Sequence, residues 1–230
     1  VIESGVLAHV AAGGQLHHHG EGVDVDGGPG DAGQSEHGVH KHGGTLGAHE
    51  GGGGEGGVAG AGSYHHTLIA HCEGRNWSLS GGLDGNGYYD GHHDVFNNVV
   101  YNWGERTTDG GSHEVNFVNN YYKMGAASRE TYLLNADLEG TGKGSQSYYV
   151  SGNVRENLNH SKTTNQNELR RYRLSNGQKL TWQVFQNKPF FPSLASIESA
   201  EAAYKNVLSD VGCNQLEPDN HDSRMVRETR

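Results

Sequence analysis

Short runs of β-branched and aromatic residues, separated by Gly, Asn and Asp, fill the chain from residue 63 onward. Such runs are typical of β-strands bounded by turns. Four of them can be aligned with one another, and they cover residues 63–69, 94–101, 116–122 and 148–154. The matching positions His66, Asn98, Asn120 and Asn153 follow at steps of 32, 22 and 33 residues. A step near 22 fits one coil of a β-solenoid, and the longer steps fit coils that carry a loop insertion.

Asparagine recurs at the matching positions, and this residue type has a physical role at bends between strands. Asn tolerates unusual backbone angles, and its amide bonds to nearby backbone groups. Stacked coils would therefore arrange Asn98, Asn120 and Asn153 as a ladder along the solenoid. The alternative is that the Asn-Asn pairs mark hairpin turns of a β-sandwich. The similar residues on both sides of each pair favour the solenoid.

The pattern changes after Asn153. Residues 155–190 are polar and include Arg170, Arg171 and Arg173, which predicts an extended arm with one or two strands around residues 180–185. Apolar residues then recur at helical spacing, at Ala200, Ala203, Tyr204, Val207, Leu208 and Val211. Ser199 can cap the first turn and Gly212 can end the helix. We therefore expect a C-terminal amphipathic helix packed on the solenoid.

The first 62 residues differ in composition from the rest. They hold 21 of the 37 glycines and one Lys, and they contain no Arg, Asn or aromatic residue. One Lys minus 8 acidic residues gives −7 of the net −10, and 16 minus 19 gives −3 for the remainder. Their apolar residues are too small and too scattered to offset chain entropy. We expect residues 1–62 to be irregular or disordered and residues 63–230 to form the folded domain.

Three interpretations of residues 1–62 stay open. The segment can be a natural Gly/His-rich linker. It can be a metal-binding tract, although zinc requires a fixed geometry that such a chain does not supply. The candidate ligands of that tract are His17, His18, His19, His37, His40 and His42. It can also be translated from a wrong reading frame, because nearly all its residue types have codons that begin with G or C.

Charge and targeting signals restrict the possible partners. The near-neutral balance of residues 63–230 does not favour nucleic acid, and no apolar run is long enough to span a membrane. Two glycosylation sequons begin at Asn76 and Asn159, which fits a secreted protein. We also expect the protein to be a monomer. Cys72 and Cys213 are the two cysteines, and whether they pair is left open. The chain lacks a starting Met and is interpreted as a fragment, so the missing signal sequence does not argue against secretion.

Residues 65–128, HHTLIAHCEGRNWSLSGGLDGNGYYDGHHDVFNNVVYNWGERTTDGGSHEVNFVNNYYKMGAAS, and residues 204–213, YKNVLSDVGC, resemble polysaccharide lyase family 1. The resemblance is closest to its fungal pectate lyase C members, and it does not reach residues 1–62. It implies a right-handed parallel β-helix and an extracellular pectate lyase. The implied reaction is the calcium-dependent β-elimination of α-1,4-linked polygalacturonate, which gives 4,5-unsaturated oligogalacturonates.

The resemblance also implies site residues. Family members carry a catalytic Arg some fourteen residues before an Asn-Asn pair, and counting back from Asn120 leads to Arg106. The candidates for substrate binding are Arg75, Asp109, His113 and Lys123. The calcium ligands of relatives fall inside the anomalous segment, where Asp24, Asp26 and Glu55 lack family-like neighbours. Asp84, Asp90 and Asp94 are more typical of turns, so no metal ligand is assigned.

In the implied reaction a base removes the C5 proton beside the uronate carboxylate, and the C4 oxygen leaves. Calcium stabilises the charge that develops. Arginine as a base conflicts with a guanidinium pKa above about 12 and would need nearby cations to favour its neutral form. A hydrolase of the polygalacturonase type would need paired carboxylates, which these coils lack. An inactive fragment or a non-catalytic pectin-binding β-helix is the second alternative.

Overall fold

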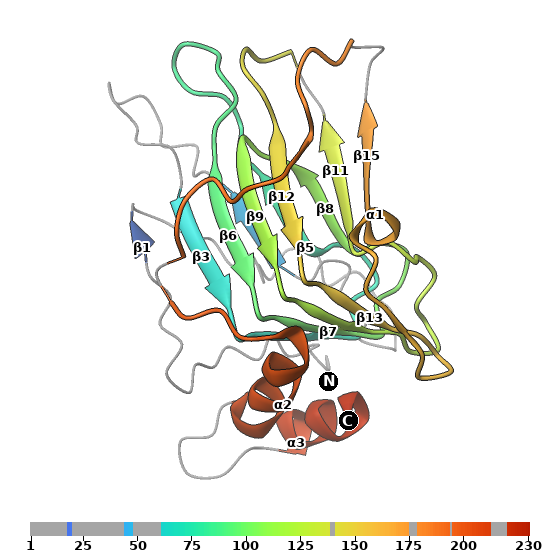
Figure 1. Ribbon diagram of the computed structural model, residues 1–230. Helices are drawn as coiled ribbons and strands as arrows, with labels where there is room; N and C mark the ends of the chain where they lie inside the picture. Colours follow the sequence, from blue (N-terminus) through green and yellow to red (C-terminus); the bar gives the residue numbers. More distant parts are fainter. Residues whose placement is uncertain are drawn as a thin grey trace, which may run out of the picture.

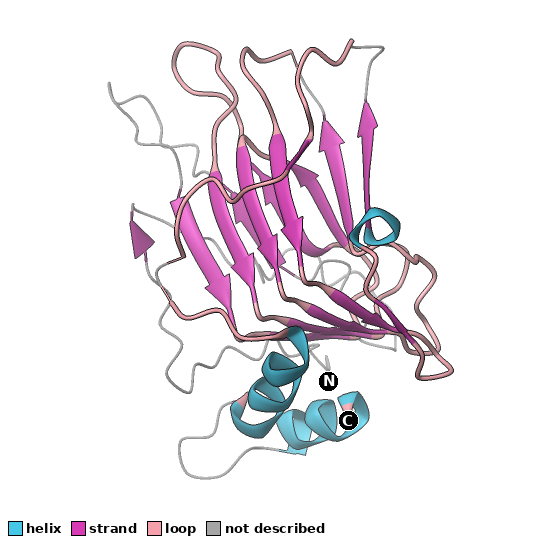
Figure 2. Ribbon diagram, in the orientation of Figure 1, coloured by secondary structure: helices cyan, strands magenta, loops and turns pink. Residues whose placement is uncertain are grey.

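The computed structural model describes residues 18–19, 44–47, 61–138, 141–174, 179–193, 195–212 and 220–230. These residues form mostly β-strands in three sheets, together with three short helices (Figures 1 and 2). All strand pairs are parallel except β1 with β3 and β13 with β14. The expectation of an all-β chain built from parallel strands is confirmed at this level.

Each sheet is built from strands of successive turns of the chain. Sheet A contains, in spatial order, β14 (Lys162–Thr163), β13 (Val154–Glu156), β10 (Tyr121–Lys123), β7 (Val99–Tyr101) and β4 (Leu68–Ala70). Sheet B contains β1 (His18–His19), β3 (Ala61–His65), β6 (His92–Phe96), β9 (Glu114–Val118), β12 (Ser147–Ser151) and β16 (Phe185–Gln186). Sheet C contains β15 (Arg170–Leu174), β11 (Leu134–Leu138), β8 (Thr108–Gly111), β5 (Asn76–Ser80) and β2 (Gly44–Gly47).

The chain visits the three sheets in a constant order. From β3 to β13 the strands follow one another through sheets B, A and C, so that each strand lies beside the one three places earlier. Each of the four aligned runs contains two strands, one in sheet B and one in sheet A, with a bend between them. The runs were therefore predicted correctly as strand segments, and the bend expected at the matching positions lies inside each run, between its two strands.

The bends explain why Asn occurs in pairs. The first residue of each pair takes a left-handed backbone, with φ of 53° at Asn97 and 51° at Asn119, and Gly152 (φ 68°) takes the same place one coil later. The second residue faces inward and forms the ladder: Asn98 donates to Asn120, and Asn120 donates to Asn153. The predicted ladder is confirmed.

The alignment of the first coil needs a correction of one residue. Leu68 pairs with Val99, so the partner of Asn98 is Thr67 and not His66. The Thr67 amide donates to Asn98 Oδ1 at 3.2 Å. His66 instead has φ of 53°, like Asn97. The corrected steps, from 67 to 98, 120 and 153, are 31, 22 and 33 residues.

Two apolar layers hold the sheets in place. The larger one lies between the three sheets, where side chains from each sheet meet; it includes Val95, Phe117, Tyr122, Leu134 and Tyr148, all fully buried. The smaller one lies on the other face of sheet A, where Leu68, Val99 and Tyr121 meet apolar residues of the C-terminal helices. Burial of this kind stabilises the fold by roughly 25 cal/mol per Å² of apolar surface.

The C-terminal helices cover sheet A from below (Figure 1). Helix α2 (Ala200–Asp210) begins at Ser199, whose side chain accepts a hydrogen bond from the Ala202 amide. Its buried residues, Ala200, Ala203, Val207 and Leu208, are four of the six that the helical spacing predicted. Tyr204 is half-buried, and Val211 is buried just after the helix. Helix α3 (Asn220–Thr229) packs beside it through Met225 and was not expected.

The prediction of an extended arm over residues 155–190 was wrong. The structure forms a hairpin from β13 and β14, a short helix α1 (Gln166–Leu169), and then β15 in sheet C. The expected strand at residues 180–185 is limited to β16, at Phe185–Gln186. Beyond it, the chain crosses the outer face of sheet B (Figure 1), where Asn116 donates to the Phe191 carbonyl at 3.1 Å.

Residues 1–62 lie almost entirely outside the described residues. Within the segment, the structure describes β1, which pairs with β3, and β2, which pairs with β5. These short strands differ from the irregular backbone that composition predicts. Of the histidine tract, the described residues include only the backbone of β1. Cys213 also lies outside the described residues, whereas Cys72 is buried and its Sγ lies 3.7 Å from the Ala70 carbonyl oxygen.

Candidate active site

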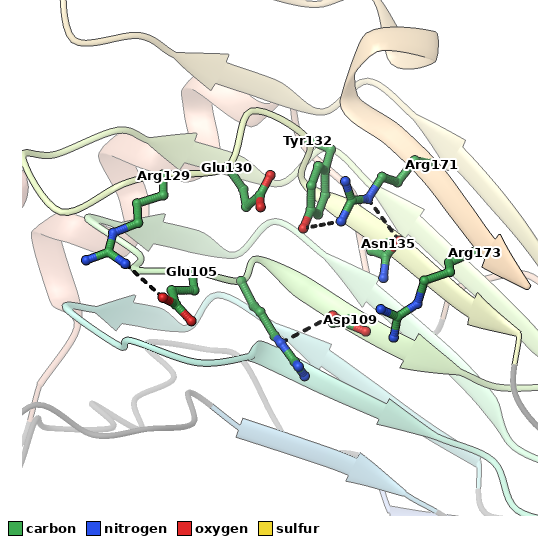
Figure 3. A pocket seen from close by; sticks show the side chains of 9 residues that line it. Glu105, Asp109, Arg129, Glu130, Tyr132, Asn135, Arg171 and Arg173 are labelled. Carbon is green, nitrogen blue, oxygen red and sulfur yellow. Dashed lines mark hydrogen bonds and ion pairs between the residues drawn. The ribbon is translucent and has the colours of Figure 1, made fainter. Parts of the chain in front are cut away.

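A polar pocket of about 290 Å³ lies on the outer face of sheet C (Figure 3). It is bordered by β8, β11 and β15 and by the loops that lead into β8 and β11. Its lining includes four arginines and three carboxylates, and it consists of Glu105, Arg106, Asp109, Arg129, Glu130, Tyr132, Asn135, Arg171 and Arg173. Because the chain as a whole carries a formal charge of −10, this concentration of arginine is a local feature.

Strand register brings the polar side chains of the pocket into one row. Asp109 pairs with Ser78 on one side and with Asn135 on the other, and Asn135 pairs with Arg171. Neighbouring strands are about 4.8 Å apart, so the row extends across four strands at that interval. Leu79, Leu134 and Ala136 alternate with these residues and point into the core. The alternation of the strands therefore places the row on the outer face.

Arg106 stands at the entrance of β8, on a rigid base. Its carbonyl oxygen accepts a 2.8 Å hydrogen bond from Nδ2 of Asn76, which is fully buried in the neighbouring coil. The next residues, Thr107 and Thr108, are also buried. The side chain is 45% exposed, and its Nε lies 4.0 Å from Oδ2 of Asp109. The backbone of Arg106 is thus fixed while its charged end reaches the pocket.

Asp109 is the buried carboxylate of the pocket, with a side chain only 5% exposed. Its Oδ1 is buried without a hydrogen-bond partner, whereas Oδ2 faces Arg106. A buried carboxylate oxygen without a donor is costly. Asp109 is therefore a buried acceptor that is paired on one side only, through Oδ2.

The other charged pairs differ in exposure. Glu105 and Arg129 meet at 2.8 Å, but both side chains are 65% exposed, and such pairs contribute little to stability. Arg173 binds Asp137 through two nitrogens, and Asp137 is 3% exposed. Asp137 is thereby neutralised next to the pocket, and Arg173 is fixed by it.

Arg171 is held by neutral groups. Its guanidinium carbon lies 3.6 Å from the centre of the Tyr132 ring (Figure 3). Its Nη2 donates to Tyr132 Oη at 2.7 Å, and its Nε donates to Asn135 Oδ1 at 3.0 Å. Burial raises the pKa of the Tyr132 hydroxyl, an effect that the positive charge of Arg171 opposes. The phenol is therefore neutral at physiological pH.

Two of the five predicted site residues, Arg106 and Asp109, line the pocket together. Arg75 lies one coil away, where its Nη1 is 3.5 Å from Oγ of Ser78, the strand partner of Asp109. His113 lies before β9 in sheet B, with Nδ1 at 2.7 Å from the Ser145 carbonyl oxygen. Lys123 ends β10 in sheet A and donates to the carbonyls of Thr229 and Arg230 at the end of α3. The structure therefore does not bring His113 and Lys123 to the pocket.

Arg171, Arg173, Tyr132 and Asn135 were not predicted as site residues. A signal for two of them was present in the sequence, because Arg171 and Arg173 alternate with period two, as outward residues of a strand do. Tyr132 and Asn135 carried no comparable signal. Their place in the pocket depends on the register between β8, β11 and β15.

The described residues do not fit a resident calcium ion. Calcium requires six to eight oxygen ligands, and the described residues contain no cluster of three or more acidic, His or Cys side chains suited to a metal. In the pocket, Glu105 and Asp109 each face an arginine. Asp24, Asp26 and Glu55 lie outside the described residues. The strand next to β5, Gly44–Gly47, has the sequence GTLG and so carries no carboxylate.

Three aspartates follow β5, and two of them have the roles in turns that were expected. Asp84 accepts hydrogen bonds from the amides of Asn86 and Tyr88, and these bonds lower its pKa. Asp90 accepts one from the Gly91 amide. Asp94 differs from expectation because it lies inside β6, where burial raises its pKa.

No family model matches the chain, and no curated protein matches it. Among the described residues, no helix is long and apolar enough to cross a membrane. The fold and the pocket together define a protein of parallel β-sheets with an arginine-lined pocket on one sheet.

Proposed function

We propose that residues 63–230 form a right-handed parallel β-helix and that the chain is a secreted pectate lyase of polysaccharide lyase family 1. The constant order of the three sheets and the coil steps of 31, 22 and 33 residues support the solenoid. The observation that carries the function is the position of Arg106, at the entrance of β8 and on the rim of an arginine-lined pocket. The resemblance of residues 65–128 to the family independently points to the same arginine.

The composition of the pocket favours an anionic polysaccharide. Four guanidinium groups line it, and guanidinium binds carboxylate with two parallel hydrogen bonds. Polygalacturonate carries one carboxylate on every sugar, so several arginines can be engaged by one chain. We therefore place the polymer across sheet C, over the row that joins Asp109, Asn135 and Arg171.

In the proposed reaction Arg106 removes the C5 proton of a bound uronate. The electron pair of the C5–H bond forms the C4–C5 double bond, the bond between C4 and the glycosidic oxygen breaks, and that oxygen takes up a proton. Negative charge accumulates on the uronate carboxylate as the proton leaves, and the neighbouring guanidinium groups stabilise it. In the family, calcium supplies further stabilisation; since the described residues do not fit that ion, no step depends on it here.

A second candidate function is the binding of polyuronate without cleavage. It is favoured by the 4.0 Å contact between Arg106 and Asp109, because an arginine held in an ion pair is suited to binding anionic groups. In this case Arg106 and the other arginines would bind the polymer, and no unsaturated product would form.

Ultraviolet absorbance of polygalacturonate digests tests the lyase function, because elimination creates a double bond conjugated to the carboxylate. We expect absorbance to rise with the intact chain and to be lost in Arg106→Ala and Arg106→Lys. Digests with added calcium and with a chelator measure the metal requirement. Binding without absorbance would support the second candidate. New reducing ends without absorbance would indicate a hydrolase, and full activity in Arg106→Ala would exclude Arg106 as the base.

A further inference from the structure

Arg171 is fixed before any ligand arrives. Its guanidinium carbon lies 3.6 Å from the centre of the Tyr132 ring, and two of its nitrogens bind Tyr132 Oη and Asn135 Oδ1. Tyr132 and Asn135 are 7% and 1% exposed, so both supports are themselves immobile. An exposed arginine ordinarily loses side-chain freedom when it binds a ligand. At Arg171 that loss has already occurred on folding.

The charge of Arg171 is not neutralised by the groups that hold it. Its two hydrogen-bond partners are a phenol and a carboxamide, both uncharged. In contrast, Arg129 faces Glu105, Arg106 faces Asp109, and Arg173 faces Asp137. The side chain lines the pocket, and Nη1 is left over from the contacts to Tyr132 and Asn135 (Figure 3). The result is a rigid cation directed at a polar pocket.

We propose that Arg171 binds a second carboxylate of the polymer, separate from the uronate that Arg106 contacts, and that it selects free over methyl-esterified uronate at that position. Arg171 and Asp109 are two strands apart, which is roughly 10 Å. A polyuronate that crosses the strands of sheet C reaches both groups with different sugars. The identity of the polymer rests on the proposed function, whereas the carboxylate site rests on the geometry of Arg171.

Arg170 provides a matched control on the same strand. Its guanidinium also lies over an aromatic ring, that of Phe185 at 4.4 Å, and its Nη2 donates to Asn167 Oδ1 at 2.8 Å. Adjacent residues of a strand point to opposite faces, and Arg170 does not line the pocket. Substitution by Lys therefore removes a planar, stacked cation in both cases, but only Arg171→Lys changes the pocket.

The test is equilibrium binding of trigalacturonate and of its methyl ester, measured by calorimetry in an Arg106→Ala background to prevent cleavage. We expect Arg171→Lys to weaken the binding of free trigalacturonate by about tenfold or more, since a hydrogen bond to a charged group contributes about 1.5–3 kcal/mol. The methyl ester should bind with the same affinity to the Arg106→Ala protein with and without Arg171→Lys. Arg170→Lys should leave both affinities within about twofold.

Tyr132→Phe is a second test variant, because it keeps the ring under Arg171 and removes the hydroxyl that fixes Nη2. It should weaken binding of the free acid by a smaller factor than Arg171→Lys. Equal loss for free acid and ester in Arg171→Lys, or unchanged affinity for the free acid, would overturn the subsite. Binding is measured apart from turnover, so a chain that shows no elimination but retains this selectivity would refute the lyase function and leave the subsite intact.

Discussion

The side-chain nitrogen of Asn120 donates a 3.0 Å hydrogen bond to Oδ1 of Asn153, one coil further along the stack. The same Oδ1 accepts the backbone amide of Asn120 at 2.9 Å. Asn98 repeats both bonds toward Asn120, and Asn153 repeats both toward Gln166. One side chain per coil thus satisfies buried backbone groups at the bend, where the sheets cannot do so.

We predict that Asn120→Ala lowers the free energy of unfolding by about 2–4 kcal/mol, because it leaves several buried donors and acceptors unpaired. These groups include the Val95 carbonyl and the Asn98 amide. Urea unfolding followed by tryptophan fluorescence measures the change. Asn86→Ala is the control, since Asn86 lies exposed in a turn. A loss no larger than that of Asn86→Ala would show that the ladder does not support the stack.

Gly110 is predicted to tolerate no side chain. Its φ is +134°, and a Cβ there would lie 1.9 Å from the Leu79 carbonyl oxygen of the neighbouring strand. We expect Gly110→Ala to cost about 3 kcal/mol or more through strain and overpacking, and to displace Asp109. Gly85→Ala is the control, because open space surrounds that glycine. Circular dichroism during thermal unfolding compares the two, and equal melting temperatures would contradict the prediction.

The sequence indicated repeated parallel strands because each repeat has the same local pattern: apolar strand residues, then an Asn pair at the bend. It located the bend at Asn98, Asn120 and Asn153 but not the residue with the unusual backbone angles, which is the preceding one: Asn97, Asn119 and Gly152. Burial does not distinguish the two positions, since Asn97 and Asn98 are both fully buried. The one-residue error at His66 has a related cause. Both His66 and Thr67 suit a bend, and only the register of Leu68 with Val99 distinguishes them.

The site was predictable only in part, for a physical reason. Arg106 and Asp109 lie on one coil, close together in the sequence, and so a local motif captured them. Arg171 and Tyr132 are 39 residues apart and meet because β15 pairs with β11. That pairing depends on the hairpin and helix α1 between the coils, whose conformation no periodic pattern reveals. His113 and Lys123 show the converse. They are close to Arg106 in the sequence, but they lie in different sheets.

Buried His93 predicts acid sensitivity. Burial lowers its pKa from 6.5 to about 4, and the nearby His92 adds to the effect, while a backbone hydrogen bond with Ser80 opposes it. The folded state favours neutral His93. The contribution of His93 to the free energy of unfolding is therefore complete above pH 6.5 and is lost as the pH falls from 6.5 to about 4. The loss amounts to at most about 3 kcal/mol.

The comparison of wild type with His93→Gln isolates this effect. Unfolding free energies measured in urea at several pH values should fall more steeply for the wild type between pH 6.5 and about 4, and the two curves should run parallel above that window. The raised pKa of Asp94 changes stability with pH in the opposite direction. Because Asp94 is present in both proteins, its contribution cancels in the comparison. Parallel curves throughout the window would show that His93 does not titrate with unfolding.

The two glycosylation sequons are predicted to differ in use when the chain is secreted from a eukaryotic host. Asn76 is fully buried, and its Nδ2 donates at 2.8 Å to the carbonyls of Gly74 and Arg106. A glycan on that nitrogen would break both bonds and displace the backbone under Arg106. Asn159 is exposed in the turn between β13 and β14, where its Oδ1 accepts hydrogen bonds from the amide and hydroxyl of Ser161.

We therefore expect a glycan on Asn159 and none on Asn76 in folded, secreted protein. Peptide mapping after enzymatic deglycosylation detects this, because release of the glycan converts the modified Asn to Asp. Ser161→Ala should abolish the modification without a large loss of stability, since Ser161 is exposed. Ser78→Ala should leave the glycan in place. A glycan on Asn76 in protein that still binds polygalacturonate would contradict the structure of the coil that supports Arg106, because the Asn76 carboxamide could not then hold both carbonyls.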